Sequence, residues 1–170
     1  MNIRLAERDL NTRFGTFREI LYYDGQSESI ALVMGTVENE ADVLCRIHSS
    51  CISAHVFNTI ECDCREQMDM SQAMIEREGK GVIIYLDQEG KGNGHLALMK
   101  SIPFKKDGFS QSEAYKIAGY EADARSFRPA AEILNELKVS SIVLLTTNPE
   151  KAADLQRYYV TVSDTKELSV

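Results

Sequence analysis

Three cysteines close together in the sequence constrain how this chain can fold. Cys51 is followed, after ten residues, by Cys62-Asp63-Cys64. Cys62 and Cys64 can bind one metal ion from a tight turn, and Cys51 reaches the same ion only if the residues between them fold back. Structural zinc normally has four protein ligands, whereas catalytic zinc has three and leaves one position to water. A metal bound here would therefore also fix the local fold.

Two other interpretations of these cysteines remain open at this point. They are ordinary reduced thiols packed as small hydrophobic side chains, or they form a redox dithiol. The second is disfavoured because the usual C-x-x-C spacing is absent. The polar neighbours His48, Asp63 and Gln67 favour a metal site, since a buried packing cysteine does not need them. The fourth cysteine, Cys45, lies in an apolar segment and is expected in the core.

Size and composition indicate one soluble domain that spans residues 1–170. The net charge of −7 argues against a nucleic-acid-binding surface, but a few local Lys and Arg side chains can still bind a small anion. Residues 1–9 alternate charged and apolar side chains, unlike a signal peptide. No apolar run approaches the roughly 20 residues of a membrane span. We therefore expect a cytoplasmic protein with reduced thiols and with no membrane or nucleic-acid partner.

The hydrophobic pattern predicts an α/β fold: a single domain with a mixed β-sheet flanked by helices. Strands are expected at 14–23, 29–37, 42–48, 81–87, 141–145 and 160–162. Helices are expected at 65–78, from 95 to an interruption at Pro103, at 110–118, from Pro129 onward and after Lys151. Ser110 and Glu113 are spaced as a capping box, and residues 104–108 are expected to form a loop. One helix face is predicted to be core: Ala130, Ile133, Leu134 and Leu137.

Two polar loops follow the buried strands of this pattern. Residues 88–94 are rich in glycine, and residues 146–151 carry two hydroxyls and a lysine. Ligands of α/β sheets bind at the carboxyl ends of strands, and glycines allow backbone N–H groups to approach an anion closely. The alternative is that residues 88–94 are only a flexible connection.

Taken in order, these motifs resemble the GTP cyclohydrolase II family over nearly the whole chain. The resemblance is carried by Cys51, Cys62-Asp63-Cys64 and Gln67, Gln88–Lys91, Asp123 with Arg125, and Leu145–Lys151. It implies one Zn²⁺ per chain on the three cysteines, with a water that attacks C8 of the guanine imidazole ring. A second hydrolysis would release formate. Loss of pyrophosphate would leave a 2,5-diamino-6-ribosylamino-pyrimidinone 5′-phosphate. Mg²⁺ bound to the triphosphate and a homodimer are implied as well.

The resemblance also implies roles for single residues. Nucleotide contacts are carried over to Arg46, His48, Ser49, Gln67, Glu89, Gly90, Lys91, Thr146 and Lys151. Asp123 takes the position of the proton acceptor. Arg125 takes a position described as a nucleophile toward the α-phosphate, although a guanidinium with a pKa above about 12 is better suited to clamp a phosphate. The alternative is that Asp123, Arg125 and the lysines are solvated surface charges.

The chain departs from the family pattern at several positions around the expected substrate. These are Ser50 for an acidic residue, Ser53-Ala54-His55 for Thr-Gly-Asp, Lys91 for arginine, Ile102 for tyrosine and Gln111 for threonine. The departures suggest a divergent paralogue that stops at the ring-opened formylamino product or opens another purine or pyrimidine nucleotide. A non-catalytic nucleotide sensor stapled by zinc is the second alternative. His55 is expected to pack beside Val56 and Phe57 in the core, with a role as fourth zinc ligand as the alternative.

Overall fold

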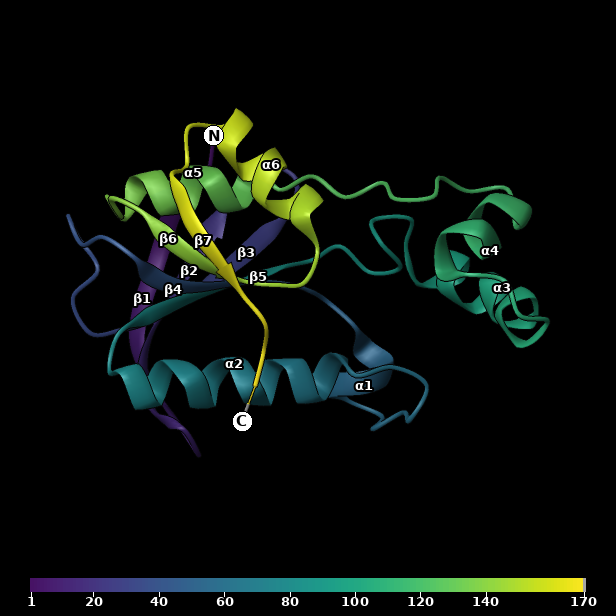
Figure 1. Cartoon of the computed structure of the whole chain (residues 1–170), viewed down its shortest axis with the longest axis horizontal. Coiled ribbons are helices and arrows are strands. Elements are labelled where there is room, and N and C mark those ends of the chain that lie inside the picture. The colour runs from purple at the N-terminus through teal and green to yellow at the C-terminus, as the bar shows by residue number, and fades with distance from the viewer. Residues whose placement is uncertain (170) are drawn as a thin grey trace.

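A seven-stranded mixed β-sheet forms the centre of this computed structural model, which describes residues 1–169 (Figure 1). Its strands are β1 (Ile3–Thr12), β2 (Gly15–Tyr23), β3 (Glu28–Met34), β4 (Val43–Ser49), β5 (Gly81–Leu86), β6 (Ile142–Leu145) and β7 (Val162–Lys166). The spatial order is β1-β2-β3-β5-β4-β6-β7. β1, β2, β3 and β5 pair antiparallel, and β5, β4, β6 and β7 pair parallel. The predicted α/β fold with a mixed sheet is confirmed.

Helices cover both faces of the sheet. They are α1 (Ile52–His55), α2 (Cys64–Glu78), α3 (His95–Lys106), α4 (Gln111–Ile117), α5 (Arg128–Glu136) and α6 (Pro149–Arg157). α5 and α6 pack on one face over the larger core, and α2 packs on the other, where Ile75 meets Phe17 and Ile83 (Figure 1). Cys45 and the predicted apolar face of α5 lie in the larger core, as expected. No helix within residues 1–169 is long and apolar enough to cross a membrane.

The parallel part of the sheet determines where the site lies. β4, β5 and β6 run in the same direction, so their carboxyl ends meet at one edge of the sheet. The segments that follow them begin with Ser50, Asp87 and Thr146. Ser50 N donates to Leu86 O at 2.9 Å, which joins the first two segments directly. The cysteines and both polar loops are therefore brought to one edge.

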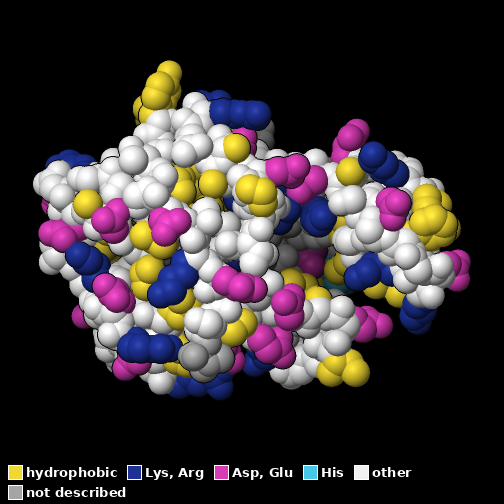
Figure 2. All heavy atoms as spheres, viewed as in Figure 1, with side chains coloured by type: hydrophobic (Ala, Val, Ile, Leu, Met, Phe, Trp, Pro, Cys, Tyr) yellow, Lys and Arg dark blue, Asp and Glu magenta, His cyan; other side chains and the backbone are white. Residues whose placement is uncertain are grey.

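Helices α3 and α4 form a hairpin that projects from this edge, away from the sheet (Figure 1). The chain leaves the body through residues 87–94 and returns through residues 118–127. In the space-filling view the surface is hollowed between the body and the hairpin, and basic side chains line part of the hollow (Figure 2). The candidate site occupies this region.

Several local expectations were wrong. α3 continues through Pro103 to Lys106, where a loop was expected. Pro103 has no N–H to donate, but its carbonyl still accepts from Asp107 N at 3.1 Å. The last strand is Val162–Lys166 rather than 160–162, and β3 ends at Met34. β1 and α1 were not among the expected elements. The capping box of α4 is confirmed, with Ser110 and Glu113 each accepting from the other's backbone.

Candidate active site

Three thiols meet beside the carboxyl end of β4. Cys51 follows β4, and Cys62 and Cys64 lie at the start of α2. The three Sγ atoms lie within 4.8 Å of one another, and Cys51 Sγ is 3.7 Å from Cys62 Sγ. The guanidinium of Arg65 donates to the carbonyls of Ala54 and His55 at 3.2 and 2.9 Å. These bonds hold α1 against α2, so the chain between the cysteines folds back as the metal hypothesis requires.

The geometry of the thiols fits zinc. Tetrahedral Zn–S bonds of about 2.3 Å place two sulfurs about 3.8 Å apart, close to the observed Cys51–Cys62 separation of 3.7 Å. Burial raises the pKa of Cys51. Burial and the two neighbouring thiols raise the pKa of Cys64. A bound cation would offset this cost by favouring the thiolates.

One of the thiols, Cys64, borders a basic cavity of about 500 Å³. Most of the predicted nucleotide contacts gather there. Its lining includes Arg46, His48, Ser49, Cys64, Gln67, Lys91, Arg125, Thr146 and Lys151. These side chains come from β4, α2, the hairpin connections and the start of α6. Four of them are basic, and two carboxylates, Asp63 and Glu167, also line the cavity. The basic side chains outnumber the acidic ones, so the cavity is suited to an anion.

Arg46 and Lys151 are buried cations, 6% and 8% exposed. Arg46 donates to Leu145 O at 3.0 Å and to Gln67 Oε1 at 2.7 Å, and its Nε is buried without a partner. Within residues 1–169, no ion pair engages either cation. Burial lowers the pKa of Arg46, and burial together with Arg46 and Arg125 lowers the pKa of Lys151 to about 7. The surface-lysine interpretation of Lys151 is therefore wrong. Burying an unpaired charge is costly unless a ligand compensates it.

Polar groups around Arg46 are held in fixed positions. Gln67 Nε2 donates to Asp63 Oδ2 at 3.1 Å, so both ends of the Gln67 amide have protein partners. His48 is buried with its Nε2 2.9 Å from His55 Nε2, and burial and Arg46 lower the pKa of His48 to about 3. The His48 ring is therefore neutral at physiological pH.

His55 pairs with His48 and is not part of the three-thiol group found among the described residues. It is half-buried, whereas Val56 and Phe57 are 59% and 69% exposed. The expected apolar flank of His55 is therefore surface rather than core.

Asp123 and Arg125 are joined to each other beside the basic cavity. Arg125 Nε lies 2.9 Å from Asp123 Oδ1, and Arg125 Nη2 lies 2.6 Å from Asp123 Oδ2. Burial acts to raise the pKa of Asp123, but the hydrogen bonds from Arg125 outweigh it and hold that pKa below its usual value. Arg125 lines the cavity, whereas Asp123 does not, and the Asp123 side chain is 39% exposed.

A second cavity, of about 360 Å³, lies between the thiols and the α3–α4 hairpin. It shares Ser49, Cys64, Lys91 and Arg125 with the basic cavity. Its lining also includes Cys51, Cys62, Glu89, Gly90, Leu98, Met99 and Tyr115. Apolar side chains from α3 form part of its wall, which suits a planar ring rather than phosphates.

The departures from the family pattern gather in this second cavity. Ser50, Ser53, Lys91, Ile102 and Gln111 all line it. These positions are scattered along the chain and form one spatial cluster in the fold.

Two lining residues of the second cavity were not anticipated. Tyr115 is 1% exposed on α4, and burial raises the pKa of its phenol to about 12. His95 begins α3, with its Nδ1 3.6 Å from Glu89 Oε1. Only their placement in the fold distinguishes them from other aromatic residues and histidines. Glu89 itself accepts from Ile52 N at 3.1 Å, so it links the Cys51 turn to α3.

Comparison with known proteins identifies the relatives of this chain. Residues 3–167 match the family described as GTP cyclohydrolase II. The riboflavin biosynthesis protein RibBA of Bacillus cereus is 43% identical over 157 residues, which is 91% of this chain and 40% of that protein. RibBA of Bacillus mycoides is 41% identical over 163 residues, or 95% of this chain and 41% of that protein. The chain spans about two fifths of the length of these relatives.

The fold is also similar to that of a solved structure. This structure is RibBX, a two-domain 3,4-dihydroxy-2-butanone 4-phosphate synthase from A. baumannii, with a TM-score of 0.52 and 16% identity. The match covers 99% of this chain and 40% of that one. At this identity it supports the fold alone. The extent of the family match and the identity to the RibBA proteins lead to one conclusion: this chain belongs to the GTP cyclohydrolase II family.

Proposed function

We propose that this chain opens the imidazole ring of GTP, releasing formate and pyrophosphate to give a 2,5-diamino-6-ribosylamino-pyrimidinone 5′-phosphate. One observation carries the proposal. The three-thiol group adjoins, through Cys64, a cavity that contains two buried cations without a carboxylate partner among the described residues. A metal-assisted hydrolase of a polyphosphate substrate needs both features side by side.

The two cavities suit the two parts of a nucleotide. Arg46, Lys151 and Arg125 would bind the phosphates, with Lys91 between the cavities. The base would lie in the second cavity, beside Cys51 and Cys62. Ser49 lines both cavities, and its buried hydroxyl has no partner among residues 1–169, so we propose that it contacts the ligand. Gln67 retains one N–H for the nucleotide after its bond to Asp63.

The residues of this chain would divide the chemistry as follows. Zinc on the three cysteines would act as a Lewis acid and lower the pKa of a water, so that hydroxide is available near neutral pH. Asp123 would accept a proton from the attacking water. In the structure Arg125 occupies both carboxylate oxygens of Asp123. A phosphate that draws Arg125 away would raise the basicity of Asp123, so substrate binding would activate the base.

Further parts of the proposal follow from family membership and the relatives' names. Mg²⁺ would accompany the triphosphate, the chain would act as a cytoplasmic homodimer, and its product would enter riboflavin synthesis. Sedimentation with and without zinc would show whether the chain forms a dimer. Turnover with and without magnesium would show whether the reaction needs Mg²⁺.

The test is mass spectrometry of the zinc-loaded protein with GTP and magnesium, with formate and pyrophosphate assayed in parallel. The expected result is the diaminopyrimidine nucleotide with equal amounts of formate and pyrophosphate. A Cys62→Ser variant provides the control, because it removes one of the three thiols. Intact GTP with wild-type protein that holds zinc contradicts the proposal. Tight GTP binding in that case would favour the nucleotide sensor.

A second candidate is a divergent hydrolase, and one observation favours it. The departures Ser50, Ile102 and Gln111 line the cavity proposed for the base. Such an enzyme stops at the formylamino product or opens another purine or pyrimidine nucleotide. A ring-opened product without formate, or turnover restricted to another nucleotide in a panel, would select it over the first proposal.

A further inference from the structure

The two connections to the α3–α4 hairpin run side by side and are bonded to each other. The outgoing connection contains the glycine-rich loop, and the returning one contains Asp123 and Arg125. Ala124 N donates to Lys91 O at 2.8 Å. This backbone bond places the Asp123–Arg125 pair directly beside Lys91.

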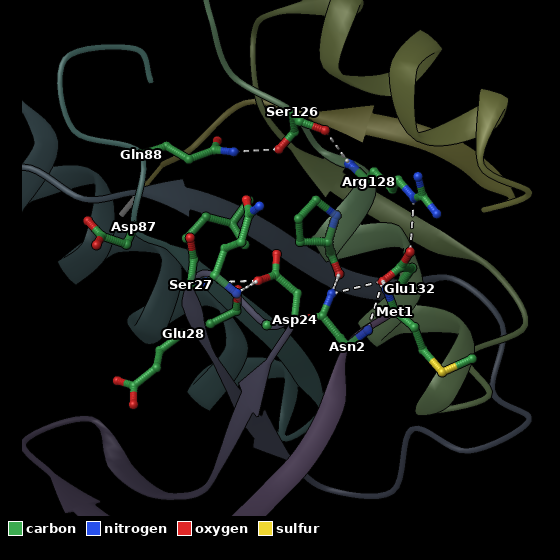
Figure 3. Close-up of a pocket in the computed structure, with 15 residues that line it drawn as sticks. Met1, Asn2, Asp24, Ser27, Glu28, Asp87, Gln88, Ser126, Arg128 and Glu132 are labelled. Atoms are coloured by element: carbon green, nitrogen blue, oxygen red, sulfur yellow. Dashed lines mark hydrogen bonds and ion pairs between the residues drawn. The ribbon is translucent and has the colours of Figure 1, made fainter. Parts of the chain in front are cut away.

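Two side-chain amides reinforce the contact on either side of that bond. Asn93 Nδ2 donates to Glu121 O at 2.9 Å and to Gly90 O at 3.2 Å. Gln88 Nε2 donates to Ser126 O at 2.6 Å. Figure 3 shows this second bond at the rim of a cavity on the side of Asp24 and Glu132, which has a volume of about 560 Å³. Each amide acts as a donor to a main-chain carbonyl of the returning connection.

Gly92 allows the two connections to approach closely. A Cβ atom at position 92 would lie 2.7 Å from the carbonyl carbon of Ala124. The backbone of Gly92 also has a φ of +82°, a conformation that other residues rarely adopt. Contacts from Gln88 to Asn93 therefore fix the returning connection from Glu121 to Ser126. The glycine-rich loop is not merely a flexible link.

We propose that Asn93 and Gln88 are positioning residues, which hold Asp123 and Arg125 in register with Lys91. The inference rests on the proposed function for its catalytic consequence, and it adds residues that were not among the expected contacts. Asn93 lines neither candidate cavity, so it acts through the returning connection and not by contact with a ligand. Gln88 lines the second cavity, so Asn93 is the residue that separates positioning from ligand contact. A displacement of about 1 Å in a catalytic group can cost up to about a hundredfold in rate.

The decisive variants change donors to acceptors without creating space. Asn93→Asp and Gln88→Glu keep the side-chain shape but direct a carboxylate oxygen at main-chain carbonyls. Asn135→Asp is the matched control, since Asn135 Nδ2 donates to Tyr158 O at 3.3 Å far along the chain. Each variant is compared with wild-type protein by zinc content, melting temperature and steady-state kinetics with GTP.

We expect Asn93→Asp to lower kcat by about tenfold or more through Asp123. KM should rise as well, because Lys91 and Arg125 lie on the two connections, but Arg46 and Lys151 lie outside them and should still bind phosphate. Gln88→Glu should act in the same direction. Zinc content should stay at the wild-type value. A kcat within about twofold of the Asn135→Asp enzyme overturns the inference. The inference is also overturned if a loss of zinc or a fall in melting temperature accounts for the lost activity.

Hydrogen exchange distinguishes failure of this inference from failure of the proposed function. In the absence of nucleotide, the amides of Gly92 and Ala124 should exchange about tenfold or more faster in Asn93→Asp than in Asn135→Asp. If wild-type protein does not turn over GTP, the proposed function fails and this readout still decides whether the amides hold the connections together. Unchanged exchange at both amides would refute the positioning role.

Discussion

The carboxylate of Asp123 and the guanidinium of Arg125 face each other in a two-point ion pair, with Nη2 2.6 Å from Oδ2. The pair lies beside Lys91 and the buried Lys151, and Arg125 and Lys151 both approach the ring of Phe127, at 5.4 and 5.6 Å from its centroid. The proposed proton acceptor and the proposed phosphate clamp are thus bonded to each other in the structure. A phosphate that competes with Asp123 for Arg125 would then control the basicity of the Asp123 carboxylate.

Asp123→Asn should lower kcat by about 10²- to 10⁴-fold, the usual contribution of general acid–base catalysis. The amide keeps the shape of the carboxylate but cannot accept a proton from water near neutral pH. Asp24→Asn is the control, because Asp24 Oδ1 only accepts from the backbone of Gln26 and Ser27 in a turn. Initial rates of formate release provide the measurement. A fall no larger than that of the control would remove Asp123 from the chemistry.

Loss of one thiol should remove the metal. Cys62→Ser is expected to abolish both zinc content and turnover, since two cysteines do not complete the three-ligand set. Cys45→Ser is the matched control: Cys45 is fully buried in the sheet, so its substitution should lower stability but leave zinc bound. Metal analysis by mass spectrometry after dialysis gives the stoichiometry. Full zinc retention in Cys62→Ser would contradict the three-cysteine site.

The pH dependence of kcat/KM should contain a contribution from Lys151. Its pKa is lowered to about 7, so the ammonium is charged below that value and is lost as the pH rises through it. Phosphate binding should therefore weaken from about pH 6 to about pH 8, by up to about tenfold in kcat/KM. In Lys151→Arg this contribution should be absent because the guanidinium stays protonated. Identical profiles for the two enzymes would show that Lys151 does not titrate in this range.

Ile102 offers a test of how the second cavity affects the reaction. Ile102→Tyr introduces a phenol beside the thiols, where it can orient or relay a proton to a water, and we expect a several-fold faster release of formate. Ile102→Phe is the control for ring size without the hydroxyl. The ratio of formate to ring-opened nucleotide, followed over time, separates the two hydrolytic steps. Equal rates in the tyrosine and phenylalanine enzymes would mean that the hydroxyl has no role.

Much of the fold follows from local patterns. The apolar runs that became β5 and β6 and the capping box at Ser110 are short-range features, so sequence detected them. β1 escaped notice because it is an exposed edge strand with alternating charges, and its pairing with β2 comes from contacts along a hairpin. A helix end was expected at Pro103 because proline disrupts a helix interior, but α3 continues through it to Lys106.

The sequence by itself determined the chemistry available to the site: three thiols at a spacing that suits zinc, and polar loops after buried strands. Only the tertiary structure decided which charges are buried. Arg46 and Lys151 are 105 positions apart, and their burial depends on β4, β6 and α6 packing together. The same holds for the bond from Gln88 to Ser126, 38 positions away. Burial and long-range hydrogen bonds depend on the whole fold, and no local pattern in the chain encodes them.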